Sequence, residues 1–146
     1  AHYQGTALEI WDQTRGGVTH FVTGLGTTGS FVGNAARLKN LDPTVTTIAL
    51  GPDSPMHWLE GWKHLETAIV PGIFTDENID HYMEIDSSEV LEMVKLIANQ
   101  EGLLLSPSSA ANLLGAKKVA KKLTSGKVVT LLPDDISKYD EILKMV

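Results

Sequence analysis

Residues 18–39 read VTHFVTGLGTTGSFVGNAARLK, and this stretch decides the fold. Its first part is an apolar, β-branched segment that predicts a strand, and its last part has the apolar spacing of a helix. The glycine-rich turn between them, from Gly24 to Ser30, brings backbone N–H groups to a helix start, where partial positive charge favours an anion. The sequence therefore predicts a phosphate-binding loop between a strand and a helix.

Two other interpretations of this loop stay open. The three glycines at 24, 26 and 29 also satisfy G-x-G-x-x-G, which in dinucleotide sites is followed about 20 residues later by an acidic residue at the tip of the next strand. Here that strand is expected to end at Leu50, and Asp53 lies beyond it in a turn-forming run. The hydroxyl groups inside the loop suit a terminal phosphate monoester better. A tight turn that binds nothing is the remaining alternative.

Composition narrows the class of protein. The 146 residues are 42% apolar and 21% charged, with a net charge of −6 and dispersed basic residues, which argues against a duplex nucleic-acid surface. The chain has no cysteine, which excludes disulfides and thiolate ligands and suits a reducing compartment. No apolar run approaches the ~20 residues of a membrane span. We expect a cytoplasmic protein without membrane or nucleic-acid partners.

Strand-like and helix-like segments alternate along the chain. Strands are expected at residues 18–23, 45–50, 81–85, 103–105 and 128–132. Helices are expected at residues 6–14, from the glycine loop to about residue 40, from Ser87 or Ser88 to Gly102, at 106–122 and at 137–145. Thr6 and Glu9 form a capping box for the first of these helices, and Ser87 or Ser88 is the expected cap of the third. Residues 51–80 show no sustained period. The order predicts one α/β domain over residues 1–146, a three-layer fold with a mostly parallel sheet and helices on both faces.

Four segments together resemble a known family. They are HYQGTALEIW (2–11), FVTGLGTTGSFVG (21–33), EGLLLSPSSAA (101–111) and VVTLLPD (128–134). In this order and spacing the chain resembles the cysteine synthase and cystathionine β-synthase family. The resemblance implies the fold of the tryptophan synthase β-subunit, of which this chain would be a large-domain portion, and the cofactor pyridoxal 5′-phosphate.

The resemblance also implies a set of cofactor-binding residues. The phosphate would be held by Gly26, Thr27, Thr28, Gly29 and Ser30, where the common family loop has glycine at 28 and threonine at 30. Ser109 would bind the pyridine nitrogen, and a neutral serine there favours β-elimination. Pro133 and Asp134 would lie at the edge of the cofactor, although the chain continues with DISKY where the family has Ser-Gly and a basic–tyrosine pair.

The family's catalytic lysine belongs to an S-x-K-D-R-like motif, and its substrate carboxylate is held by a T-S-G-N-T-like loop. Neither motif occurs in this sequence, so no catalytic residue is predicted in it. We expect a piece that pairs with an N-terminal half, in a homodimer, and is inactive alone. The complete enzyme would convert an O-activated serine to cysteine. The alternatives are a cystathionine β-synthase, a serine or threonine dehydratase, or a non-catalytic phosphate- or dinucleotide-binding module.

Residues 51–80 also hold histidines and tryptophans. His57, Glu60 and His64 have ligand chemistry but lack the spacing of a helical metal site, so no metal is predicted. Trp58 and Trp62 flank Gly61, and ordinary packing is the favoured interpretation over a pocket wall or a dimer surface.

Overall fold

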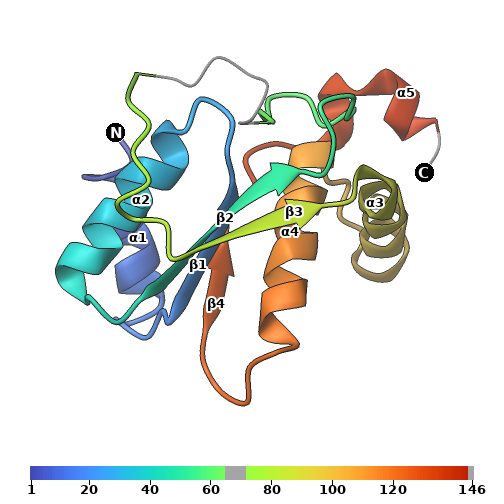
Figure 1. Cartoon of the computed structure of the whole chain (residues 1–146). Coiled ribbons are helices and arrows are strands. Elements are labelled where there is room, and N and C mark those ends of the chain that lie inside the picture. The colour runs from blue at the N-terminus through green and yellow to red at the C-terminus, as the bar shows by residue number, and fades with distance from the viewer. Residues whose placement is uncertain (65–71, 145–146) are drawn as a thin grey trace.

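The computed structural model describes residues 1–64 and 72–144. Helices and strands alternate, and the helices lie on both sides of a central sheet (Figure 1). The elements in chain order are α1 (Thr6–Gln13), β1 (His20–Gly24), α2 (Gly29–Leu41), β2 (Thr46–Pro52), β3 (His81–Ile85), α3 (Ser87–Glu101), α4 (Pro107–Ala120), β4 (Val128–Thr130), the 3₁₀ turn η1 (Ile136–Lys138) and α5 (Asp140–Leu143).

The four strands form one parallel sheet in the order β3-β2-β1-β4. In the register, His20 of β1 lies opposite Thr46 of β2 and Val128 of β4. Because the strands are parallel, their carboxyl ends share one edge, where ligands bind in such sheets. The glycine loop after β1 and the LPDD turn after β4 therefore come to the same edge, and the predicted α/β class is confirmed.

Alternate residues of the strands fill two separate cores. Val22 and Ile48 pack on one face with α3 and α4, whereas Phe21 and Ala49 pack on the other face with α1 and α2. This alternation follows the period of two in a strand, and it produces the three layers seen in Figure 1. Among the described residues, no helix has the length and apolar character that a membrane crossing requires.

Two predicted helix caps are wrong. Thr6 is the first residue of α1 and does not cap it; the N-cap is Gly5, and the Thr6 hydroxyl lies 3.1 Å from His2 Nδ1. At α3 the cap is Asp86, one residue before the predicted serines, and its carboxylate accepts from the Ser88 N–H at 2.8 Å. Aspartate and serine are equally good caps, so local sequence alone does not choose between neighbours.

The predicted strand at 103–105 is also wrong. Only Leu105 pairs, in an isolated antiparallel bridge with Asp135, while Leu103 and Leu104 are 53% and 45% exposed. The predicted C-terminal helix is divided into η1 and α5, and its expected end at residue 145 lies outside the described residues. Residues 51–80 contain no helix or strand in their described part beyond the end of β2, as predicted.

Asp80 joins β2 to α2 ahead of the edge strand β3. Its carboxylate accepts from Lys39 Nζ at 2.7 Å, from the Thr47 N–H at 2.7 Å and from the Thr47 hydroxyl at 3.0 Å. Partial burial raises the pKa of Asp80, but the hydrogen bonds from Lys39 and Thr47 outweigh it, so the pKa is lowered.

We expect Asp80→Asn to reduce the free energy of unfolding by about 1 kcal/mol at pH 7, since the ion pair is half-exposed and screened. A lowered pKa means that the ionised group stabilises the fold above its unfolded value of about 4, and that this contribution disappears as pH falls through the folded value. Urea unfolding of both proteins at pH 7 and pH 3 tests this. A difference that is as large at pH 3 as at pH 7 would contradict it.

Candidate functional site

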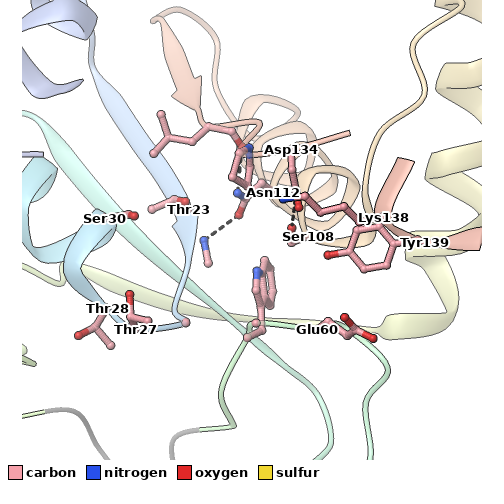
Figure 2. A pocket seen from close by; sticks show the side chains of 16 residues that line it. Thr23, Thr27, Thr28, Ser30, Glu60, Ser108, Asn112, Asp134, Lys138 and Tyr139 are labelled. Carbon is pink, nitrogen blue, oxygen red and sulfur yellow. Dashed lines mark hydrogen bonds between the residues drawn. The ribbon is translucent and has the colours of Figure 1, made fainter. Parts of the chain in front are cut away.

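A cavity of about 460 Å³ opens at the carboxyl edge of the sheet. Four segments line it: the end of β1 with the glycine loop, residues 60–62, the first turns of α4, and residues 131–139. Figure 2 shows Thr27 and Thr28 on one side of this cavity and Ser108, Lys138 and Tyr139 on the other. The parallel sheet thus brings together residues more than 100 positions apart in the sequence.

The glycine loop is built to accept an anion. The backbone N–H groups of residues 26–30 make no hydrogen bond to other described residues, and α2 begins at Gly29 directly behind them. Thr28 is the N-cap of α2 in a left-handed conformation with φ of 70°. Its hydroxyl oxygen is buried and has no partner among the described residues, although the residue lines the cavity. A buried hydroxyl without a partner is costly, so this hydroxyl is suited to a hydrogen bond with a ligand in the cavity.

Thr28 carries backbone strain, because a β-branched residue is rarely found in the left-handed region. We expect Thr28→Gly to raise the free energy of unfolding by about 1 kcal/mol while weakening phosphate-ester binding about fivefold through the lost hydroxyl. Thermal unfolding and calorimetric titration measure the two effects separately. Thr27→Gly is the control for stability, because Thr27 does not have a positive φ and its replacement relieves no strain. A Thr28→Gly protein less stable than the wild type would contradict the prediction.

Ser30 is held from outside the loop. Its hydroxyl lies 3.2 Å from His2 Nε2, and His2 Nδ1 lies 3.1 Å from the Thr6 hydroxyl. His2 therefore links the start of the chain to the lining of the cavity.

Three serines and a carboxylate form the opposite wall. Ser106, the N-cap of α4, lies 2.5 Å from Asp134 Oδ1 and 2.9 Å from the Ser109 hydroxyl. Ser108 lies 3.3 Å from the same carboxylate oxygen and lines the cavity. Ser109 is fully buried, and its hydroxyl donates to the Asp134 carbonyl at 2.7 Å. Ser108 lines the cavity and Ser109, the serine predicted to bind the ring nitrogen, does not, since successive helix positions point about 100° apart.

Asn112 connects the two walls. Its Oδ1 accepts from the Gly24 N–H at 2.7 Å, and its Nδ2 donates to the Leu131 carbonyl at 2.9 Å. The residue is 3% exposed and lines the cavity (Figure 2). It fixes the end of β1, where the glycine loop begins, relative to the turn that carries Asp134.

Acidic side chains surround Tyr139 at the outer rim. Burial raises the pKa of Tyr139, and the charges of Asp134 and Glu60 raise it further. The tyrosine is therefore neutral at physiological pH and can donate its proton in a hydrogen bond. Lys138 lines the same rim.

The predicted site residues are largely brought together. Those that line the cavity are Gly26, Thr27, Thr28, Ser30, Pro133 and Asp134. Gly29 begins α2 within the loop. The sequence interpretation missed Ser108 and Asn112 and favoured mere packing for Trp62, which also lines the cavity. An asparagine within the small and apolar residues of 110–116 was the available signal for Asn112.

The alternative sites gain no support. Asp53 follows β2 but accepts from the Ser87 N–H at the start of α3, at 3.4 Å, and does not line the cavity, so the dinucleotide interpretation is not favoured. Among residues 1–64 and 72–144, no three side chains of the metal-binding types gather as a metal site.

Comparison with known proteins gives the class of protein. Residues 1–134 match the pyridoxal-phosphate dependent enzyme family, and the chain belongs to it. It is 37% identical to a cysteine synthase of Aquifex aeolicus over 95% of this chain and 44% of the relative, and 35% identical to a cystathionine beta-synthase of Apis mellifera over 95% of this chain and 30% of the relative. A crystal structure of cysteine synthase from Entamoeba histolytica superposes with a TM-score of 0.88 at 26% identity, over 98% of this chain and 45% of that one. The chain therefore spans less than half the length of these proteins.

Proposed function

We propose that this chain supplies the pyridoxal-phosphate-binding part of an enzyme that replaces the β-substituent of an O-activated serine to make cysteine. The observation that carries the proposal is the glycine loop, whose N–H groups and buried Thr28 hydroxyl have no partner among the described residues; Thr28 lines the same cavity as Ser108. The relationship to the Aquifex aeolicus cysteine synthase supports this reaction over others of the family. An amino-acid substrate and a homodimer belong to the same proposal.

The residues present fit the cofactor. The phosphate would be held by the N–H groups of residues 26–30 and by the hydroxyls of Thr27, Thr28 and Ser30, at the start of α2. Gly26 has no room for a side chain, since a Cβ there would lie 2.2 Å from the Gly61 carbonyl oxygen. When bound, pyridoxal phosphate supplies the electron sink for bond cleavage next to the α-carbon of an amino acid.

Ser108 is the residue that we assign to the ring nitrogen. Its hydroxyl lines the cavity and is oriented by Asp134, and Pro133 lies beside it on the same wall. A serine at this position is neutral, and it holds the ring without placing a carboxylate directly on it.

The two serines can be tested separately. We expect Ser108→Ala to weaken pyridoxal-phosphate binding about tenfold and to shift the absorption band of the bound cofactor, because a direct contact is lost. Ser109→Ala should mainly lower the melting temperature, because Ser109 bonds to the protein itself. Absorbance titration and thermal unfolding of both variants decide the assignment. A larger effect of Ser109→Ala on the absorption band would assign the contact with the ring nitrogen to Ser109 instead.

The proposed reaction is tested on the complete protein loaded with pyridoxal phosphate. We expect cysteine from O-acetylserine and sulfide. The Apis mellifera relative supports a second candidate, the formation of cystathionine from serine and homocysteine, and product analysis by mass spectrometry distinguishes the two. A protein that only deaminates serine or threonine would overturn both.

A further inference from the structure

Trp62 comes from the irregular segment between β2 and β3, and its side chain is 9% exposed. It is one of the residues that line the cavity, even though nine-tenths of its surface is covered. Tryptophan combines a large apolar ring with a single N–H donor, which usually finds a partner when buried. Among residues 1–64 and 72–144, the buried polar side-chain atoms that lack a hydrogen-bond partner do not include the indole nitrogen of Trp62. The inference therefore depends on where the indole lies and not on an unpaired buried donor.

The segment that carries Trp62 is fixed to the glycine loop by its backbone. The Lys63 N–H donates to the Leu25 carbonyl at 2.8 Å, and the Trp62 N–H donates to the Leu59 carbonyl at 3.2 Å. Leu59 itself is fully buried. The backbone at Trp62 and Lys63 is therefore held in place, which limits where the indole can lie.

Two glycines of the loop accommodate this segment. A Cβ on Gly24 would lie 2.1 Å from Trp62 Cε2 and 2.5 Å from its Nε1, so the indole packs directly on the Gly24 backbone. Gly26 is covered in the same way by the Gly61 carbonyl. The indole N–H is thus beside the start of the phosphate-binding loop, where the loop's own Gly24 N–H is already bonded to Asn112.

We propose that Trp62 is a ligand-contacting, specificity-determining residue whose indole N–H donates a hydrogen bond to an oxygen of the ligand held by the glycine loop. This inference rests on the proposed function, because it takes pyridoxal phosphate as the ligand. A neutral donor in this place adds affinity for an acceptor oxygen without adding charge to a loop that binds through backbone N–H groups. It also selects against ligands that place an apolar group there.

The test uses the protein labelled with ¹⁵N in its tryptophan indoles, titrated with pyridoxal phosphate and separately with inorganic phosphate. The ³¹P signal of the ligand reports whether the glycine loop is occupied. We expect the Trp62 indole signal, assigned with Trp62→Phe, to move downfield on binding. A shift with both probes identifies a phosphate oxygen as the acceptor, and a shift with pyridoxal phosphate alone identifies an oxygen on the ring.

Affinity gives a second readout. Trp62→Phe keeps the aromatic wall but removes the donor, and we expect pyridoxal-phosphate binding to weaken five- to tenfold. Trp58→Phe is the matched control, since Trp58 is partly exposed and does not line this cavity. The inference would be overturned, and the proposed function would not, if the ³¹P signal showed binding while the Trp62 indole signal stayed in place and Trp62→Phe bound with unchanged affinity. A ³¹P signal that never changes would overturn the proposed function and the inference with it.

Discussion

Gly26→Ala is expected to abolish measurable binding of pyridoxal phosphate, with at least a hundredfold loss of affinity, and to lower the free energy of unfolding by about 2–4 kcal/mol. The cause is steric: the added methyl carbon would lie 2.2 Å from the Gly61 carbonyl oxygen and 3.3 Å from the Gly61 carbonyl carbon. Both are backbone atoms, so no side-chain rotation relieves the overlap. Either the glycine loop or the segment that carries Trp62 must move.

The movement would reach the ligand site from either direction. Displacing the loop misaligns the N–H groups of residues 26–30, and displacing the segment breaks the Lys63–Leu25 backbone bond and removes the indole from the cavity wall. An error of about 1 Å in a preorganised anion site is enough to cost two orders of magnitude. Calorimetric titration and urea unfolding measure the two consequences.

Two other glycines provide matched controls. A Cβ on Gly29, in the same loop, would meet Ile73 Cδ1 at 3.5 Å, an ordinary contact, so Gly29→Ala should retain the stability of the wild type. Gly72 has open space around it, and Gly72→Ala should leave both stability and binding unchanged. If Gly26→Ala were as stable as Gly29→Ala and still bound pyridoxal phosphate, the close packing of residues 59–63 on the loop would be refuted.

The parts of the fold that sequence predicts are those set by local chemistry. The β1–loop–α2 unit follows from an apolar run, glycines and a renewed helical period, and β3 has the bounds predicted for it, residues 81–85. Alternating strands and helices favour parallel pairing, which places the carboxyl ends of β1 and β4, and so the glycine loop and the LPDD turn, at one edge. The hydroxyl groups of Thr27, Thr28 and Ser30, on which the proposed phosphate site depends, can be identified in the sequence for the same reason.

Other features cannot be predicted from the sequence because they depend on tertiary contacts. Ser108 and Ser109 are identical in type and adjacent, and only the packing of α4 on β4 decides which one faces the cavity. Leu103 and Leu104 are apolar in sequence yet exposed, because the chain at Leu105 pairs with Asp135 and does not enter the sheet. Trp62 lies in a segment without periodicity, so no pattern shows that its indole lies against Gly24.

Asn112 illustrates a residue whose importance is visible only in three dimensions, and it carries the second large effect. Asn112→Leu keeps the approximate volume but leaves the Gly24 N–H and the Leu131 carbonyl without partners in a buried place. Each unsatisfied group costs about 1–3 kcal/mol, so we expect the free energy of unfolding to fall by about 2–4 kcal/mol. Binding of pyridoxal phosphate should weaken as well, since the two walls of the cavity lose their common anchor.

Asn112→Asp distinguishes the contributions of the two hydrogen bonds that the Asn112 side chain makes, with the Gly24 N–H and with the Leu131 carbonyl. A carboxylate still accepts from the Gly24 N–H but faces the Leu131 carbonyl with an oxygen, which is repulsive. Repulsion and burial disfavour the charged form and raise the pKa of the new carboxyl group above its unfolded value. The native state then holds the proton more tightly than the unfolded state, so the variant should regain stability relative to wild type as pH falls from 7 to 5.

Urea unfolding of the wild type, Asn112→Leu and Asn112→Asp at pH 7 and pH 5 checks both expectations. Asn40→Ala is the control, because Asn40 is an exposed asparagine of α2 that donates only to the Tyr3 hydroxyl, and its loss should change stability by less than about 0.5 kcal/mol. A stability gap between Asn112→Asp and the wild type that is small at pH 7 and does not narrow at pH 5 would show that the Leu131 bond contributes little. The Gly24 bond alone would then hold the start of the glycine loop, and Asn112→Leu would be the more damaging change at both pH values.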